Sequence, residues 1–366
     1  MSNTAHDDLL PIDQTPVGEL LGRELESRGW SQADFATVID RPTQFVSEIV
    51  TGKKEITRES AAQIGAALGQ SPEFWLRLQD QYLLARQATN KATQAKLGDV
   101  RRRARLNELA PIQILQKRKI LTGSTLDELE AEVSSLFGLT SIDSQPEIAA
   151  AAKRANAGEG ITMLQQAWLA CVRKQARTLP PQGEYSPEML AKLAASLPRL
   201  VRTAEDFAAL PERLRDAGVR LVYVEALPGA KIDGCAMFVD GYPVIGVSGR
   251  GKRLDKVLFT LLHEIAHILR GHVDDGPIVE DLDDSHAQES NREREANDSA
   301  GTWIFPGGHP VVPSRINAPW VEQTATKLGL ARIVLIGQLQ KRGRLDWRTT
   351  LAKNAPSVSD VLPRWE

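Results

Sequence analysis

The chain has 366 residues, a quarter of them charged, and a formal net charge of −2. This length allows two or three domains, and the near-balance of charge excludes a global field that would attract nucleic acid or a membrane. No apolar run is long enough to span a membrane, and the first residues lack a secretory signal. The spacing of Cys171 and Cys235 favours two isolated, buried thiols over a disulfide or a metal site. We therefore expect a cytoplasmic protein whose DNA contacts, if any, come from local patches.

Residues 15–110 are predicted to form a bundle of five short helices without strands. Pro16 is suited to the start of the first helix, and Ser31 and Thr57 are N-cap candidates for later ones. Ser71 and the proline after it open a fifth helix, which we expect to continue to about residue 103.

Two consecutive helices of this bundle have the spacing of a helix-turn-helix. Phe35 and Ala36 on the first would pack against Val46 and Ile49 on the second, and the small alanine permits a close crossing. Exposed polar residues on these helices, and basic residues after them, would contact bases and phosphates. A bundle that binds a protein is the alternative, and a homodimer would be the usual way to gain operator affinity. The predicted DNA contacts are Gln32, Thr43, Gln44, Ser47, Lys53 and Lys54.

The rest of the chain is predicted to change from helical to mixed structure. Residues 111–215 indicate a helical linker or sensor region, and residues 311–366 a C-terminal helical extension. Between them, residues 216–310 favour an α+β domain with a small sheet. The predicted fold class is therefore multidomain and mainly α, with an α+β domain toward the C-terminus. We expect strands near 219–224, 235–239 and 243–247, and helices near 254–269, 289–304, 318–328 and 331–342.

A zinc-peptidase motif lies in the predicted helix at 254–269. His263 and His267 are four residues apart, so on a helix they share one face and can reach a single cation. Glu264 projects beside that face, where it can take a proton from a zinc-bound water. Apolar residues cover the rest of the helix, which predicts that it is buried. A core helix that merely carries two histidines is the alternative.

Catalytic zinc usually has three protein ligands, and the third is expected from the Glu-rich segment after residue 290. Glu293 and Asn297 would share one helix face, so Glu293 is the predicted third ligand and Asn297 a polar neighbour. Glu295 is the fallback ligand. His272 is a weaker one, for which we expect a solvent-exposed role. The residue that stabilises the oxyanion stays open between Tyr242, His286 and His309.

Two family resemblances accompany these motifs. The segment from about Pro16 to Arg86, with SQADFA, RPTQFVSEIVTGKKEIT and SPEFWLRLQDQYLLA, resembles the XRE-type helix-turn-helix domains of HigA-like antitoxins. The segment from about Val219 to Pro306, with DGCAMFVDGYPVIGVSGR and LFTLLHEIAHIL, resembles the ImmA/IrrE metallopeptidase domain. That resemblance implies a zincin-like domain that binds Zn²⁺ through His263, His267 and Glu293, with Glu264 as the catalytic residue. Ser299 departs from the aromatic residue that the family tends to have.

The resemblances imply a DNA-binding transcriptional regulator that carries out regulatory proteolysis. Its substrate would be a repressor or antitoxin-type protein in a stress-response or toxin–antitoxin-like circuit, and its N-terminal domain would bind double-stranded operator DNA. The alternative is a HigA-like antitoxin or repressor whose peptidase domain acts mainly as a sensor or partner-binding module. In a third hypothesis, residues 111–215 bind a toxin.

Overall fold

The chain divides into two compact units, Met1–Arg102 and Arg103–Glu366. The boundary between the two units falls inside helix α6 (Lys91–Leu109). None of the helices in the described part of the chain is long and apolar enough to cross a membrane. The residues that the computed structural model describes are 15–146, 153–154, 161–179, 183–280 and 290–365.

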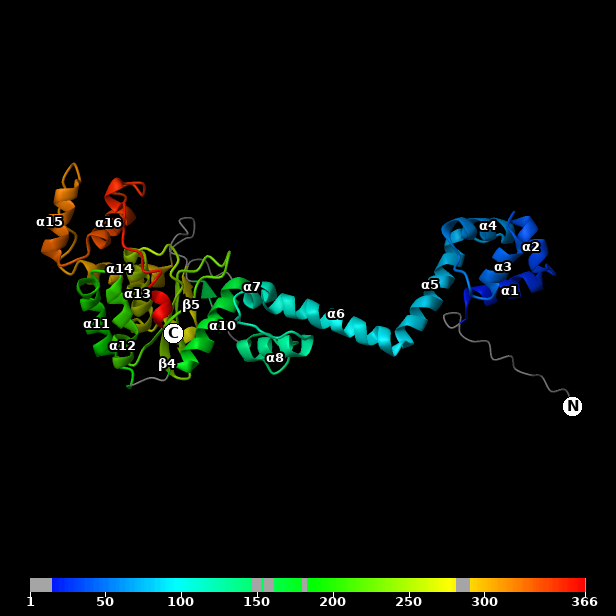
Figure 1. The fold of residues 1–366 in the computed structure, drawn as a ribbon, viewed down its shortest axis with the longest axis horizontal. Helices are drawn as coiled ribbons and strands as arrows, with labels where there is room; N and C mark the ends of the chain where they lie inside the picture. The colour runs from blue at the N-terminus through cyan, green and yellow to red at the C-terminus, as the bar shows by residue number, and fades with distance from the viewer. Residues whose placement is uncertain (1–14, 147–152, 155–160, 180–182, 281–289, 366) are drawn as a thin grey trace. The chain divides into compact units, whose positions relative to one another are not determined.

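In the described part of the first unit, helices α1 to α5 pack around one apolar core, as predicted, and the start of α6 follows them (Figure 1). Ser31 and Thr57 are N-caps, each accepting a backbone N–H from three residues further on in a capping box, which stabilises the starts of α2 and α4. Gly69 ends α4 in the left-handed conformation that glycine adopts without strain. The helices are α1 (Val17–Ser27), α2 (Gln32–Val38), α3 (Thr43–Val50), α4 (Arg58–Leu68) and α5 (Pro72–Thr89).

The prediction that the fifth helix continues to about residue 103 is wrong. Helix α5 ends at Thr89, because Asn90 has an extended backbone with ψ of 106°. The Asn90 side chain then accepts the backbone N–H of Thr93 at 3.1 Å, so α6 begins as a new helix.

Five strands of the second unit form one mixed sheet in the order β1-β5-β3-β4-β2 within the described residues. Strand β3 is antiparallel to both β4 and β5, whereas β2 runs parallel to β4 and β1 parallel to β5. Asp240 and Gly241 both have positive φ and join β3 to β4 in the predicted hairpin. The three predicted strands are confirmed, and β1 and β5 were not predicted. The bounds are β1 (Lys153–Arg154), β2 (Arg220–Tyr223), β3 (Gly234–Val239), β4 (Tyr242–Val247) and β5 (Ile278–Glu280).

Apolar cores cover both faces of this sheet. Ala236 and Ile245 point into the core that contains helix α13 (Leu254–Leu269), whereas their neighbours Cys235 and Val244 point into the core of helix α10 (Met163–Thr178). Helix α10 approaches closely at Gly246, where an added Cβ would lie 2.8 Å from a Val172 methyl. Figure 1 shows α11, α12, α13 and α14 on one side of the strands and α10 on the other.

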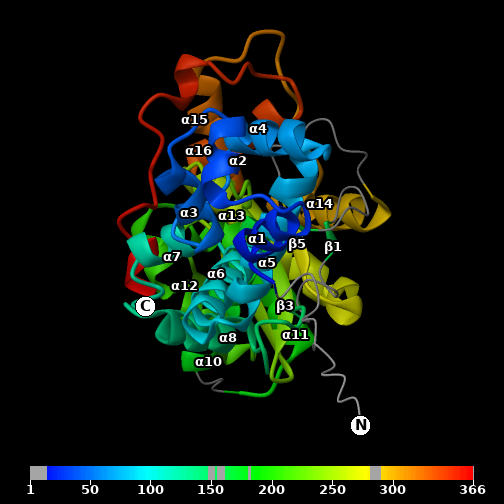
Figure 2. The same cartoon turned by 90° about the vertical axis from the view of Figure 1, so that its right-hand side faces the viewer.

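Helices from the predicted linker and from the predicted extension belong to the same compact unit as the sheet. Helices α8 and α10 supply one core, and α11, α12 and α16 supply the other, because strands that are apolar on both faces must be covered on both. Helices α15 and α16 lie side by side at the top of Figure 2. The bounds are α7 (Ile112–Lys117), α8 (Leu126–Phe137), α11 (Pro187–Leu200), α12 (Leu210–Asp216), α14 (Asn291–Ile304), α15 (Ala318–Leu328) and α16 (Arg332–Lys341).

Candidate metal centre and helix-turn-helix face

Helix α13 carries two of the predicted metal ligands. Its bounds, Leu254–Leu269, agree with the predicted helix, and nearly all its residues are buried, as the apolar pattern predicted. The helix ends before Gly271, which has a φ of 69° and so turns the chain away from the helix axis. The motif therefore lies on a deeply packed helix.

His263, His267 and Glu293 lie together in the second unit. The two Nε2 atoms are 2.9 Å apart, and the Glu293 carboxylate oxygens lie 3.1 Å from Nε2 of His263 and 3.2 Å from Nε2 of His267. One donor atom of each residue lies within 4.8 Å of those of the other two. The two histidines are 0% exposed and the glutamate 1%. The fold thus brings the three predicted ligands to one point, in a donor set that suits a divalent metal.

Burial also gives one histidine the charge state that metal binding needs. Desolvation lowers the pKa of His267 to about 4, although the Glu293 carboxylate opposes that shift. The imidazole is therefore neutral near pH 7, and a neutral imidazole nitrogen can donate its lone pair to a metal.

Helix α14 positions the third residue of the cluster. Ser290 is its N-cap and accepts the backbone N–H of Glu293 at 3.2 Å, which holds this glutamate in the first helical turn. Ala296, one turn further on, is fully buried among the packed helices, and a small residue allows helices to approach each other closely.

Glu264 is fully buried next to the cluster, and a glycine of the sheet leaves room for it. Gly234 begins strand β3, and a Cβ added there would lie 2.6 Å from Oε1 of Glu264 and 2.6 Å from a methyl carbon of Thr260. The backbone of β3 thus packs directly on the carboxylate that we expect to act as the base. The only signal for Gly234 in the sequence is a glycine at the start of an apolar strand, which does not by itself indicate a contact with the site.

Two residues outside the cluster extend it into a chain of contacts. Nδ1 of His267 lies 2.9 Å from Nδ1 of His272, and Nε2 of His272 lies 3.1 Å from a carboxylate oxygen of Glu295. His272 is 6% exposed, so the expectation of a solvent-exposed role is wrong. The cause is tertiary, because Arg292 of α14 donates to the carbonyl of His272 at 3.3 Å and the helix covers it. Glu295, the fallback ligand, contacts this histidine.

The other polar residues considered for the site lie elsewhere. Asn297 accepts a hydrogen bond from Lys341 at 2.8 Å. Tyr242 pairs with Val239 at the far end of β3 from Gly234, which separates it from Glu264 by most of a strand. His309 lines a different pocket, and His286 lies outside the described residues. Neither Tyr242 nor His309 therefore lies with the three clustered residues.

The first unit contains the predicted helix-turn-helix. Helices α2 and α3 pack against each other, with Phe35, Ala36, Val46 and Ile49 in one core. Thr43, Gln44, Lys53 and Lys54 are exposed, whereas Gln32 and Ser47 are half-buried. For all six residues, a contact with DNA stays a prediction.

Glu48 organises the exposed side of α3. Its carboxylate accepts a hydrogen bond from the Gln44 amide at 3.0 Å and lies 3.8 Å from the ammonium of Lys54. The same ammonium lies 4.7 Å from the centre of the Phe45 ring. Two of the predicted DNA contacts are therefore tied to one acidic residue.

Unit 1 is therefore a helix-turn-helix bundle, the architecture of many DNA-reading regulators. Two curated relatives share sequence with this chain. An uncharacterized HTH-type transcriptional regulator of Haemophilus influenzae is 35% identical over 88 residues, which is 24% of this chain and 82% of the relative. The HTH-type regulator YddM of Escherichia coli K12 is 31% identical over 68 residues, which is 19% of this chain and 72% of the relative. Through its N-terminal region, this chain belongs to the family of HTH-type transcriptional regulators.

Solved structures of antitoxins are similar to a comparably small share of the chain. An addiction module antidote protein of the HigA family from Coxiella burnetii has 35% identity, covering 19% of this chain and 78% of its own, with a TM-score of 0.19. The Pseudomonas aeruginosa antitoxin HigA, solved with the higBA promoter, has 28% identity, covering 22% and 90%, with a TM-score of 0.22. No family profile matches the chain.

Proposed function

We propose that this regulator binds operator DNA through its first unit and hydrolyses a protein at a zinc centre in its second unit. The observation that carries the proposal is the convergence of His263, His267 and Glu293 within 4.8 Å, from two helices, with the buried Glu264 next to His263 in the sequence of α13. Two imidazoles and a carboxylate are a donor set of catalytic zinc, which keeps a fourth position open.

The reaction would be peptide-bond hydrolysis. A bound zinc ion supplies a Lewis acid for the scissile carbonyl. Glu264 follows the first ligand on α13 and would accept the proton of the attacking water, then deliver it to the leaving amine nitrogen. The packing of Gly234 against this carboxylate would keep it oriented during both transfers.

We infer the binding partners of the protein from features of both units. Resemblance to the ImmA/IrrE peptidases supports a repressor or antitoxin-type protein as the substrate. The Pseudomonas aeruginosa HigA structure contains a promoter, which supports operator DNA as a ligand of unit 1. A toxin is a further candidate partner by the likeness to an addiction module antidote protein, and a homodimer would present two recognition helices to a two-fold operator.

The test is a Glu264→Gln variant of the full chain, with the exposed Glu322→Gln on α15 as a matched control. We expect the first variant to bind one zinc ion and operator DNA like the wild type but to lose cleavage of the co-expressed repressor or antitoxin. The control should retain all three properties. Absence of stoichiometric zinc in the wild-type protein, or unchanged cleavage by Glu264→Gln, would contradict the proposal.

One observation favours a second candidate function. The four residues of the site are at most 1% exposed, so a peptide reaches them only after the surrounding chain moves. A closed site suits a HigA-like antitoxin or repressor in which the second unit senses a ligand or partner. This function predicts that regulation of the operator in cells is the same with Glu264→Gln as with the wild type. Loss of regulation with that variant would favour the peptidase.

A further inference from the structure

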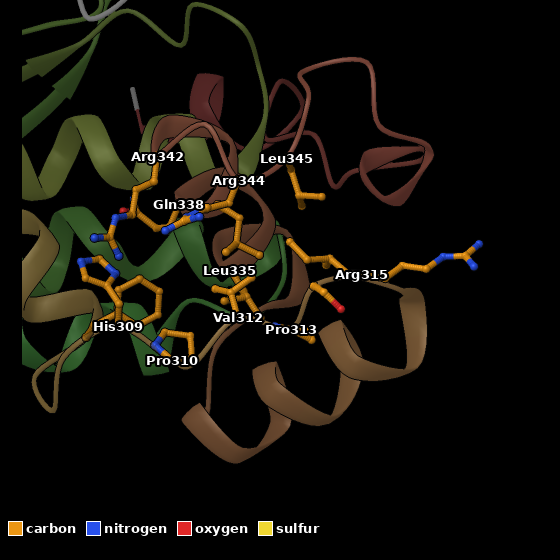
Figure 3. A pocket seen from close by; sticks show the side chains of 14 residues that line it. His309, Pro310, Val312, Pro313, Arg315, Leu335, Gln338, Arg342, Arg344 and Leu345 are labelled. Carbon is orange, nitrogen blue, oxygen red and sulfur yellow. The ribbon is translucent and has the colours of Figure 1, made fainter.

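A pocket lies apart from the candidate metal centre. It has a volume of about 580 Å³ and is formed by the segment that follows α14 and by the C-terminal end of α16 (Figure 3). None of the residues that line this pocket belongs to the metal cluster, and none forms a described hydrogen bond with a residue of the cluster. Its volume lies in the range of pockets that bind small molecules.

The charged residues of this pocket are all basic. Arg315, Arg342 and Arg344 line it, and no aspartate or glutamate does. Figure 3 shows Arg315 extending away from the others, whereas Arg342 and Arg344 lie over the pocket. Within the described chain, the side chains of Arg342 and Arg344 form no hydrogen bond or ion pair. Two guanidinium groups at one pocket without an acid leave a positive potential that an anion would neutralise.

The polar lining adds a buried amide. Gln338 is 9% exposed, and its side chain makes no hydrogen bond with the described residues. A ligand in the pocket can therefore form hydrogen bonds with this amide. The amide can offer both a donor and an acceptor to a ligand.

An aromatic and apolar wall completes the pocket. The rings of Phe305 and His309 are tilted against each other with centroids 4.9 Å apart, and Leu335 and Leu339 line the pocket beside them. Desolvation and the nearby charge of Arg342 lower the pKa of His309, so its ring is neutral near pH 7. A planar apolar group of a ligand could pack on this wall.

We propose that this pocket binds a small molecule that carries a phosphate group and a planar apolar part. The double negative charge of a phosphate monoester matches the two guanidinium groups of Arg342 and Arg344, whereas a carboxylate matches only one. Gln338 would hydrogen-bond the polar edge of the ligand, and Phe305 and His309 would contact its ring. The site is independent of the metal chemistry, so its ligand is measurable in a Glu264→Gln background.

The test uses isothermal titration calorimetry on the full chain, with adenosine monophosphate as the probe and adenosine, inorganic phosphate and acetate for comparison. We expect adenosine monophosphate to bind with a dissociation constant of about 1 mM or below. Inorganic phosphate should bind more weakly, and adenosine and acetate should give no measurable heat. Arg342→Ala and Arg344→Ala should each weaken binding about tenfold. Arg315→Ala, on the same pocket but pointing away, is the control and should change little.

Circular dichroism of each variant checks that the fold is kept, and Arg342→Lys and Arg344→Lys replace any alanine variant that unfolds. The proposal is wrong if adenosine monophosphate gives no heat, or if it binds the Arg342→Ala, Arg344→Ala double variant as well as the wild type. The proposal is also wrong if the double variant binds a DNA duplex of unrelated sequence more weakly than the wild type does, and adenosine monophosphate does not displace that duplex from the wild type. In that case the two arginines contact a nucleic-acid backbone.

Discussion

Nδ1 of His267 lies 2.9 Å from Nδ1 of His272, deep in the second unit. When His267 presents the lone pair of Nε2 to a metal, its Nδ1 carries the hydrogen and donates it. His272 then accepts at Nδ1 and donates from Nε2 to the Glu295 carboxylate at 3.1 Å. In this series of three side chains, each N–H donor has an acceptor. The contacts therefore select one tautomer of His267 and orient its ring.

His272→Ala should therefore weaken zinc binding. Loss of such an outer hydrogen bond typically lowers metal affinity roughly 10–100-fold. Glu295→Ala should have a smaller effect in the same direction, and Glu295→Gln should restore affinity, because its amide oxygen still accepts from His272. Competition with a chromogenic zinc chelator measures all three variants. Zinc affinity of His272→Ala equal to that of the wild type would show that these contacts do not position the ligand.

Gly234→Ala should damage the site from the side of the sheet. The new methyl group would lie 2.6 Å from both Glu264 and Thr260, so the carboxylate or the strand must move. Overpacking of this kind costs about 1–3 kcal/mol of stability. Cleavage should fall further than zinc content, because the base is displaced and the ligands are not. Gly301→Ala on α14, where an added Cβ meets no atom within 4 Å, is the control. Full activity of Gly234→Ala would refute the close approach.

Glu48→Gln should strengthen DNA binding by unit 1. The acid accepts from Gln44 and lies near Lys54, and its negative charge opposes phosphate approach. Removing the charge should raise affinity several-fold and steepen its dependence on salt, since Lys54 becomes available for phosphate. Fluorescence anisotropy at several salt concentrations measures both quantities. Glu73→Gln, an exposed acid in the first turn of α5, serves as the comparison. Weaker binding confined to particular operator sequences would contradict this and would mean that Glu48 itself contacts a base.

Stability of the second unit should depend on pH through Glu128. Hydrogen bonds from the backbone N–H groups of Thr125 and Ser124 lower the pKa of Glu128 from 4.5 to about 2. Since the folded pKa is below the unfolded one, its stabilisation is present above pH 4.5 and is lost as pH falls toward 2. Glu128→Gln should thus lower the melting temperature at pH 7, and the difference from wild type should shrink below pH 4.5. A difference independent of pH would contradict this assignment.

Local signals made much of this structure predictable. Ser31 and Thr57 cap helices because their side chains accept nearby backbone N–H groups, an effect confined to a few residues. The bounds of α13 follow from its apolar pattern and from Gly271 after it. Strands β1 and β5 have only two and three residues, too few for any period to show in the sequence.

The sequence by itself determined the helix-turn-helix and the face that His263 and His267 share, because the α-helical repeat alone places residues four apart together. Tertiary structure alone decided how the site is surrounded. The packing of α14 on α13 buries His272 and aims Glu295 at it, and strand β3 places Gly234 on Glu264. These contacts join segments far apart in the chain, and their geometry depends on the packing of whole elements, which no local pattern encodes.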